Sequence, residues 1–134
     1  MQAFLEEAKR SSRTIANLST AVKNKVLNEM ADALMNHCDF IISHNEKDMM
    51  DARVNNLSES LQDRLLLTGQ RVKDMADAIR QIASQLEPVG RILDGWVTKD
   101  GLNIQKVSIP IGVIAIIYES RPNVTSDTAA LCFK

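Results

Sequence analysis

The sequence predicts an α/β protein, in which a helical part precedes a β-hairpin and the beginning of a doubly wound parallel sheet. Three observations favour this class. The first 87 of the 134 residues contain a single glycine and no proline, whereas the last 47 contain four glycines and all three prolines. Two stretches after Pro88 are typical of the strands of a hairpin, and residues 111–118 are apolar on both faces. A strand that is apolar on both faces normally lies in the middle of a parallel sheet.

Composition and charge exclude several classes of protein. Hydrophobic residues make up 45% of the chain, which is enough for a packed core and excludes disorder as its main description. The 16 Lys and Arg nearly balance the 17 Asp and Glu, so the chain lacks the charge signature of a nucleic-acid or anionic-membrane binder. The longest apolar run, residues 111–118, is too short to span a bilayer, and residues 1–10 do not resemble a signal peptide. We therefore expect a soluble, cytoplasmic protein.

The two cysteines, Cys38 and Cys132, are too few and too far apart in sequence for a disulfide framework, and we expect two buried thiols. Cys132 lies among apolar residues with no histidine nearby, which predicts a core residue rather than a nucleophile. Cys38 follows His37 and has His44 further along, but this set lacks the companions and spacing of metal ligands. The sequence therefore predicts no metal site.

Helical periodicity predicts four or five packed helices before Pro88. The first places these residues near one face: Phe4, Leu5, Ala8, Ser12 and Ile15. Ser19 can cap the second, whose expected inward residues are Val22, Val26, Met30, Ala33 and Leu34. After a break near residues 37–39, a third helix is expected, with these residues at helical spacing: Ile41, Ile42, Asn45, Met49 and Ala52.

Ser58 is expected to open a short helix through Leu65, and Thr68 to open the most regular helix of the chain. The expected inward residues of that last helix follow the i, i+3, i+4, i+7 rule: Val72, Met75, Ala76, Ile79, Ala83 and Leu86. Pro88 and Gly90 then end the helical part.

Residues 91–98 and 102–109 are expected to form a hairpin around a turn at residues 99–101. In the second strand the apolar residues change face between Ile104 and Val107, which predicts a bulge or bend near Gln105-Lys106.

Residues 111–118 are the one candidate for a buried parallel strand, so the neighbouring strands of its sheet are missing from the sequence. A polar loop, residues 119–123, follows, and Thr125, Ser126 and Asp127 can satisfy the free N–H groups of a helix start. A strand, loop and helix in this order are typical of the beginning of a doubly wound domain, and we expect a chain that stops within it. The alternative is an α+β domain in which the hairpin covers the strand.

The segment from Pro110 to Thr125, PIGVIAIIYESRPNVT, resembles the hallmark stretch of the γ-glutamyl phosphate reductases, a family of the aldehyde dehydrogenase superfamily. Shorter matches to that family occur earlier in the chain: Asp51-Ala-Arg, Asn56-Leu-Ser, Asp63-Arg-Leu, Arg71-Val-Lys-Asp-Met-Ala and Glu87-Pro-Val-Gly-Arg. The resemblance covers essentially all 134 residues and implies the first third of such an enzyme.

The resemblance implies the N-terminal part of an NAD(P)-binding, Rossmann-like domain, with a helical part (1–87), a hairpin ribbon (88–110) and a first β-α unit (111–134). It implies NADPH-dependent conversion of L-glutamyl 5-phosphate to L-glutamate 5-semialdehyde and phosphate in proline biosynthesis. It also implies a homo-oligomer bridged by the ribbon and a functional coupling to glutamate 5-kinase. The family's catalytic cysteine is expected beyond Lys134, so we expect residues 1–134 alone to be inactive.

Asn123 is the candidate catalytic residue. It follows the carboxyl end of the predicted strand, where ligands gather in open α/β sheets, and its amide can donate to a developing oxyanion. The resemblance implies that it stabilises the thiohemiacetal oxyanion that forms when the catalytic cysteine attacks the acyl carbon. The alternative is that Asn123 only caps the following helix, since asparagine is a preferred cap.

Glu119, Ser120, Arg121 and Pro122 are the candidate cofactor-binding residues, because the resemblance implies that this loop lines the cofactor cleft. The Arg121 guanidinium could hold a phosphate of the substrate or of the cofactor through two hydrogen bonds. An ion pair of Arg121 with Glu119 or Asp127 is the alternative. No Gly-x-Gly-x-x-Gly motif follows the strand, so the assignment of NADPH depends on the resemblance.

Two other functions stay open. The helix-rich first 87 residues favour a non-catalytic helical interaction module. Another aldehyde dehydrogenase relative that acts on a different acyl substrate is the second alternative, which the string Tyr-Glu-Ser-Arg-Pro-Asn weakens.

Overall fold

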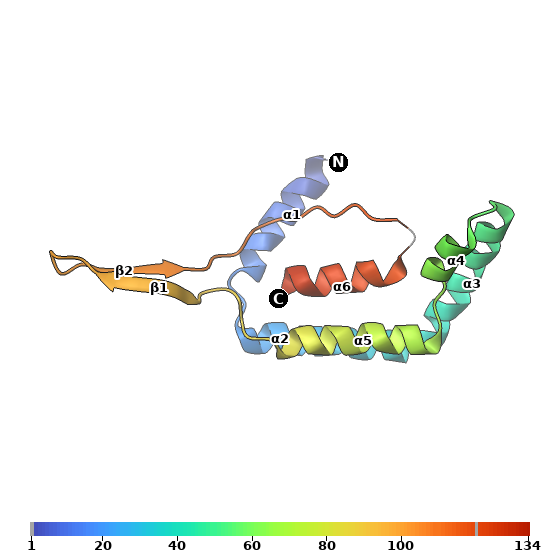
Figure 1. Ribbon diagram of the computed structural model, residues 1–134, viewed down its shortest axis with the longest axis horizontal. Coiled ribbons are helices and arrows are strands. Elements are labelled where there is room, and N and C mark those ends of the chain that lie inside the picture. The colour runs from blue at the N-terminus through green and yellow to red at the C-terminus, as the bar shows by residue number, and fades with distance from the viewer. Residues whose placement is uncertain (1, 120) are drawn as a thin grey trace.

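The computed structural model describes residues 2–119 and 121–134, which form six helices and one two-stranded sheet. In chain order the elements are α1 (Gln2–Ile15), α2 (Thr20–Asn36), α3 (Cys38–Val54), α4 (Glu59–Leu65), α5 (Gly69–Ser84), β1 (Ile92–Val97), β2 (Asn103–Val107) and α6 (Pro122–Phe133). Helices α2, α5 and α6 lie together, while α1, the α3–α4 pair and the hairpin project from them (Figure 1). The expected helix-rich fold with a hairpin is confirmed.

The core lies where α2, α5 and α6 meet. Its buried residues come from all three helices: Leu27, Ala31, Ala76, Ile79, Ile82, Ala83 and Ala130. Four of these seven are alanines, so the helix backbones can approach closely. Helices α2 and α5 run in opposite directions, and α6 lies along α5 (Figure 1).

Helix α5 follows the predicted pattern. The Thr68 side chain accepts a hydrogen bond of 3.2 Å from the Arg71 N–H, which caps the helix as expected. Every expected inward residue is buried except Leu86, which lies beyond the end of the helix and is 79% exposed.

Helix α2 begins at the expected cap, with a 3.3 Å hydrogen bond from the Val22 N–H to the Ser19 hydroxyl. Its predicted inward face is only partly correct: Val26, Met30 and Leu34 are half-buried, and Met30 and Leu34 pack against the core. The buried residues are Lys23, Leu27 and Ala31, whereas Val22 and Ala33 are exposed. The apolar pattern could not reveal this face, because it begins with a lysine that is buried through an ion pair.

The expected inward face of α1 is only half correct. Ala8, Ser12 and Ile15 are half-buried, but Phe4 and Leu5 are 73% and 55% exposed. Helix α1 projects away from the three packed helices, so its first turns have no element of the described chain to cover them (Figure 1).

Helices α3 and α4 form a projecting pair. His37 separates α2 from α3, and Asn45, Met49 and Ala52 are buried as predicted. Ser58 directly precedes α4, as expected, although its side chain makes no capping hydrogen bond. A second cluster, formed by Leu67, Val72 and Met75, packs against partly buried residues of α2 and α3: Leu34, Cys38, Ile41 and Ile42.

Strands β1 and β2 pair in antiparallel register around the expected turn, where Gly101 has φ +82° and donates from its N–H to the Thr98 oxygen at 3.0 Å. The register shifts between the pairs Ile92↔Val107 and Asp94↔Lys106, so the irregularity is beside the predicted position. However, the extra residue belongs to β1 rather than to the second strand. Sequence alone does not fix this, because a bulge depends on how two strands pair.

The predicted buried strand at residues 111–118 is not formed. This segment passes along α6 with no regular secondary structure and no pairing to β1 or β2 (Figure 1). Its side chains are exposed, for example Ile111 at 88% and Ile117 at 101%. A strand needs neighbours for its backbone N–H and C=O groups, and the described residues provide none. The hairpin projects away from the segment, so the α+β alternative is wrong as well (Figure 1).

Helix α6 begins at Pro122, three residues before the expected start at Thr125. Proline suits a first helical position because its missing N–H would have no helical partner there. Pro122 and Asn123 are therefore helical residues, not loop residues. Near the other end of α6, Cys132 is exposed, and Cys38 is only half-buried, so the expectation of two buried thiols is wrong.

Candidate functional site

A cavity of about 410 Å³ lies between the first turn of α6, the α4–α5 connection and the first half of α5. Three of the five sequence-predicted site residues line it: Arg121, Pro122 and Asn123. Helices α5 and α6 begin at the same end of the molecule, next to α4 (Figure 1). The cavity is therefore the candidate functional site.

The α4–α5 connection forms one wall, and a buried asparagine fixes it. Asn45 of α3 donates from Nδ2 to the Leu65 oxygen at 2.8 Å and accepts at Oδ1 from the Leu67 N–H at 2.7 Å. Asn45 is only 4% exposed, so these bonds satisfy an amide that would otherwise be costly to bury.

Arg71 of α5 braces the same connection. Its guanidinium donates to the Leu66 oxygen at 2.8 Å and to the Asp63 carboxylate at 2.7 Å, and it also donates to the Asp63 backbone oxygen. The Arg71 guanidinium is therefore paired with residues of this wall. The wall is therefore held from both sides, by α3 and by α5.

The first turn of α6 forms the opposite wall. Arg121 is the N-cap residue, with φ −137° and ψ 90°, and its side chain makes no capping hydrogen bond. The first N–H groups of a helix carry a partial positive charge and have no partner within the helix. A hydrogen bond of 2.5 Å between the Tyr118 and Thr125 hydroxyls ties the preceding segment to this turn.

Asn123 occupies the second position of α6, and its Nδ2 donates to the Asp127 carboxylate one turn later at 3.0 Å. The cap is Arg121, so the alternative in which Asn123 only caps the helix is wrong. Because a carboxylate can only accept, Asp127 fixes which end of the amide faces it. The second N–H of Asn123 has no partner in the described part of the chain and can donate to a ligand.

Arg121 is exposed, and no other described residue forms a hydrogen bond or an ion pair with its guanidinium. The alternative ion pair with Glu119 or Asp127 is therefore not formed. Glu119 is also exposed. The predicted site residue Ser120 lies outside the described residues.

Neither Cys38 nor Cys132 lines the cavity. Within residues 2–119 and 121–134, no group of three or more His, Cys, Asp or Glu could hold a metal ion. The helices that the structure describes include none long and apolar enough to cross a membrane.

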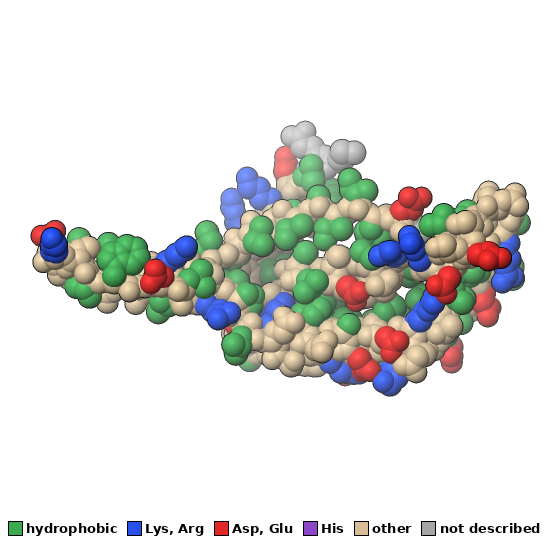
Figure 2. Space-filling view, in the orientation of Figure 1, with side chains coloured by type: hydrophobic (Ala, Val, Ile, Leu, Met, Phe, Trp, Pro, Cys, Tyr) green, Lys and Arg blue, Asp and Glu red, His purple; other side chains and the backbone are tan. Residues whose placement is uncertain are grey.

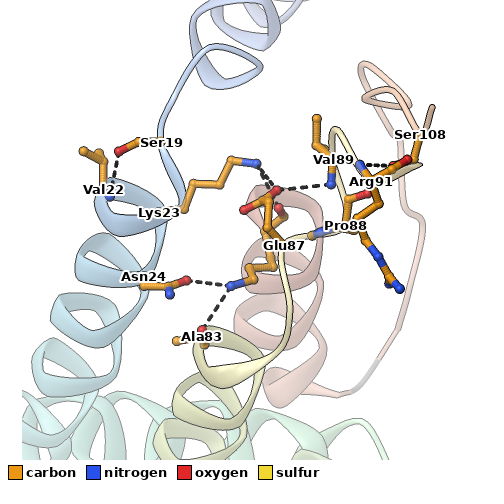
Figure 3. A network of polar contacts seen from close by, with 11 residues as sticks. Ser19, Val22, Lys23, Asn24, Ala83, Glu87, Pro88, Val89, Arg91 and Ser108 are labelled. Atoms are coloured by element: carbon orange, nitrogen blue, oxygen red, sulfur yellow. Dashed lines mark hydrogen bonds and ion pairs between the residues drawn. The ribbon is translucent and has the colours of Figure 1, made fainter. Parts of the chain in front are cut away.

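At the ends of α5 and α6 that lie away from the site, a buried polar network joins α2, the segment after α5 and the end of α6 (Figure 3). Lys23 donates from Nζ to Glu87 at 2.8 Å and to the Lys134 oxygen at 3.0 Å. Lys134 in turn donates to the Asn24 side chain at 2.6 Å and to the Ala83 oxygen at 3.0 Å. The network therefore fixes the far end of α6 against α2 and α5.

The Glu87 carboxylate of this network is held in its charged form. Burial by itself would raise the pKa of Glu87, but hydrogen bonds from Lys23 and from the Val89 N–H, together with the charges of Lys23 and Lys134, outweigh burial. The net result is a pKa below the usual value for glutamate.

Reasoning from sequence missed the α4–α5 wall. Arg64, Arg71 and Asp74 all line the cavity, but they lie about 50 residues before Asn123 in the chain. The only signal in the sequence is that all three fall in short matches to the γ-glutamyl phosphate reductases, Asp63-Arg-Leu and Arg71-Val-Lys-Asp-Met-Ala. Only the packing of α6 beside α5 brings them to the same site.

No protein-family model matches the chain. Among curated relatives, the gamma-glutamyl phosphate reductase of Aliarcobacter butzleri is 77% identical over all 134 residues, which is 32% of that protein. The gamma-glutamyl phosphate reductase of a Sulfurovum species is 63% identical over the whole chain and 33% of its own length.

Two solved structures have the same fold. The crystal structure of gamma-glutamyl phosphate reductase from Thermotoga maritima has a TM-score of 0.91 and 38% identity, over 96% of this chain and 31% of that one. The same enzyme from Saccharomyces cerevisiae also has a TM-score of 0.91, with 29% identity, over 96% of this chain and 33% of that one.

These similarities define the class of protein first: the chain has the fold of the N-terminal part of an oxidoreductase. The particular oxidoreductase it matches is gamma-glutamyl phosphate reductase, over the whole length of the chain. The chain spans about a third of the length of the curated relatives it matches.

Proposed function

We propose that the chain is the N-terminal part of an NADPH-dependent reductase that converts L-glutamyl 5-phosphate to L-glutamate 5-semialdehyde and phosphate in proline biosynthesis. The observation that carries the proposal is the 77% identity to a gamma-glutamyl phosphate reductase over all 134 residues. The same observation favours the enzyme over a non-catalytic interaction module and over a relative with another acyl substrate.

Within such an enzyme, Asn123 would donate its unpaired N–H to the oxyanion that forms on the acyl carbon. A preorganised amide donor at that point stabilises the charge that develops in the transition state. The 3.0 Å bond to Asp127 supports this role, because it holds the amide in one orientation before the substrate arrives.

Arg121 would bind a phosphate, since its guanidinium is unpaired within the described chain and stands at an uncapped helix start. This arrangement fits an anionic cofactor, and we propose that Glu119, Ser120, Arg121 and Pro122 contribute to holding NADPH. The cofactor supplies the hydride when it is bound.

The nucleophile would come from a part of the enzyme beyond residues 1–134. Neither Cys38 nor Cys132 lines the cavity that contains Asn123. A thiolate that displaces phosphate must reach the acyl carbon beside the amide of Asn123.

Homo-oligomer formation, cytoplasmic location and coupling to glutamate 5-kinase are parts of the same proposal.

The test is the Asn123→Ala variant of a full-length chain that carries this sequence. If the amide stabilises the oxyanion, kcat for phosphate-dependent oxidation of L-glutamate 5-semialdehyde should fall by roughly 10² to 10³. A full-length protein without this activity would refute the proposed function. An active protein whose kcat is unchanged in Asn123→Ala would refute the role of Asn123 alone.

A further inference from the structure

The cavity beside Asn123 is lined by both positive and negative side chains. A site that binds only an oxyanion and a phosphate would not need the negative ones. Three arginines and three aspartates line it: Arg64, Arg71, Arg121, Asp63, Asp74 and Asp127. Several of these groups already have partners within the chain. The charged side chains available to a ligand are therefore those that have no partner within the described chain.

Arg64 is the unpaired cation of the α4–α5 wall. The Arg71 guanidinium already donates hydrogen bonds to Asp63 and to the backbone of the α4–α5 connection. Arg64, in the last turn of α4, is exposed, and no described residue forms a hydrogen bond or an ion pair with it. A guanidinium free at the edge of a cavity is suited to bind a carboxylate with two parallel hydrogen bonds.

Asp127 is the anion of the α6 wall, and one of its carboxylate oxygens accepts no hydrogen bond from the described residues. Its Oδ2 accepts from Asn123, whereas its Oδ1 is buried and has no hydrogen-bond partner among the described residues. Asp74, by contrast, accepts from Gln70 at 2.7 Å. A buried carboxylate oxygen without a donor is costly, and a ligand ammonium would satisfy it.

We propose that this cavity binds the α-amino acid end of the substrate, with Arg64 binding its α-carboxylate and Asp127 its α-ammonium. The inference rests on the proposed function and adds the residues that select an amino-acid substrate. A free cation on one wall and an unsatisfied carboxylate oxygen on the other match the two charges of an α-amino acid. Asn123, which lines the same cavity, would then lie toward the reacting end.

The experiment uses a full-length chain that carries this sequence, with NADP⁺, phosphate and either L-glutamate 5-semialdehyde or glutarate semialdehyde, which lacks the α-amino group. Arg64→Gln should raise KM for both aldehydes by about 10- to 100-fold, with little change in kcat or in KM for phosphate, because it removes a charged hydrogen bond. Arg64→Lys should give an intermediate KM, since it keeps the charge without the paired geometry.

Asp127→Asn should reduce the preference for L-glutamate 5-semialdehyde over glutarate semialdehyde, because only the former carries the ammonium. The matched control is Arg53→Gln, which removes an arginine from the last turn of α3, away from the cavity, and should leave both KM values unchanged.

Two results would overturn the inference while the proposed function stands. One is an active Arg64→Gln enzyme with an unchanged KM for L-glutamate 5-semialdehyde. The other is a rise in KM for phosphate in place of KM for the aldehydes, which would make Arg64 a phosphate ligand. An unmodified full-length protein without activity would refute the proposed function instead.

Discussion

At the scale of single residues, a buried lysine and a glutamate decide how α2 is oriented. Lys23 is 3% exposed, and its Nζ lies 2.8 Å from a Glu87 carboxylate oxygen. Burying a charge without a partner is strongly unfavourable, whereas a hydrogen-bonded pair largely offsets its own desolvation. Glu87 Oε2 is buried without a hydrogen-bond partner among the described residues, so the carboxylate depends on Lys23.

The Lys23→Met variant tests this dependence. At pH 7 the variant should unfold with a free energy about 3 kcal/mol lower, because Glu87 loses its partner while it stays largely buried. The pKa of Glu87 is lowered in the folded protein, so its stabilisation is complete above the unfolded value of about 4.3. As the pH falls through the lower, folded pKa, the stabilisation is lost, and the difference between the two proteins should shrink. Urea unfolding at pH 7 and at low pH measures both.

Lys73→Met is the control, because Lys73 forms an ion pair of 2.6 Å with Asp77 that is exposed to solvent. Exposed pairs contribute little, so this variant should resemble the unmodified chain. An equal loss in both variants would contradict a special role for the buried pair.

At the scale of elements, α5 is the helix on which the rest of the helical part packs. It contacts α2, α3 and α6, and its buried face contributes to both core clusters. Ile79 is fully buried at its centre. The same helix supplies Arg71 and Asp74 to the candidate site, so its packing also sets the site's geometry.

Ile79→Ala should therefore lower the free energy of unfolding by about 2–5 kcal/mol, through lost burial and the cavity that remains. The matched control is Ile117→Ala, which truncates the same residue type at a position that is 101% exposed. Thermal unfolding of the 134-residue chain followed by circular dichroism compares the two. Similar losses for both variants would show that α5 is not the centre of the core.

The hairpin exposes every residue of its two strands. Large apolar side chains remain uncovered on it, among them Trp96 at 52% and Leu102 at 64%, and green side chains are visible along the projecting arm in Figure 2. Two-stranded hairpins are marginally stable alone in water, so a partner surface would stabilise this one. We therefore keep the prediction that the ribbon bridges subunits of a homo-oligomer.

Replacing Trp96 and Leu102 together with glutamine should lower the mass of the full-length protein in light scattering, because apolar surface that one subunit buries against another would become polar. The exposed Phe4→Gln change on α1 is the control. An unchanged mass for the double variant would place the ribbon within a single subunit.

At the scale of the whole molecule, the apolar segment 109–118 remains uncovered. It includes several large exposed side chains: Ile109, Ile111, Val113, Ile114, Ile116, Ile117 and Tyr118. An unpaired apolar stretch of this length favours self-association. Of the cofactor cleft implied for the family, the described residues supply the loop before α6 and the start of that helix.

The 134-residue chain is therefore expected not to bind NADPH tightly. Calorimetric titration with NADPH should give no micromolar binding, because one side of a cleft provides only part of the contacts that a dinucleotide needs. A full-length chain with the same sequence is the positive control. Micromolar binding to monomeric residues 1–134 would show that a complete cofactor site lies within them.

The sequence by itself determined most of the helices, because their caps and apolar spacing are local. Ser19 and Thr68 cap their helices as the sequence predicts, and the buried face of α5 follows the 3.6-residue period. The position of the hairpin turn was also local, since Gly101 supplies a positive φ that other residues rarely adopt.

Only the tertiary structure decided the features that depend on distant partners. Lys23 is inside because Glu87, 64 residues later, pairs with it, and residues 111–118 form no strand because none lies beside them. The residues of the predicted loop, Arg121 and Asn123, could be named from the sequence, but Arg64 and Arg71 could not be placed next to them. Their meeting depends on α6 packing along α5, which is a contact between segments about 50 residues apart that no local pattern encodes.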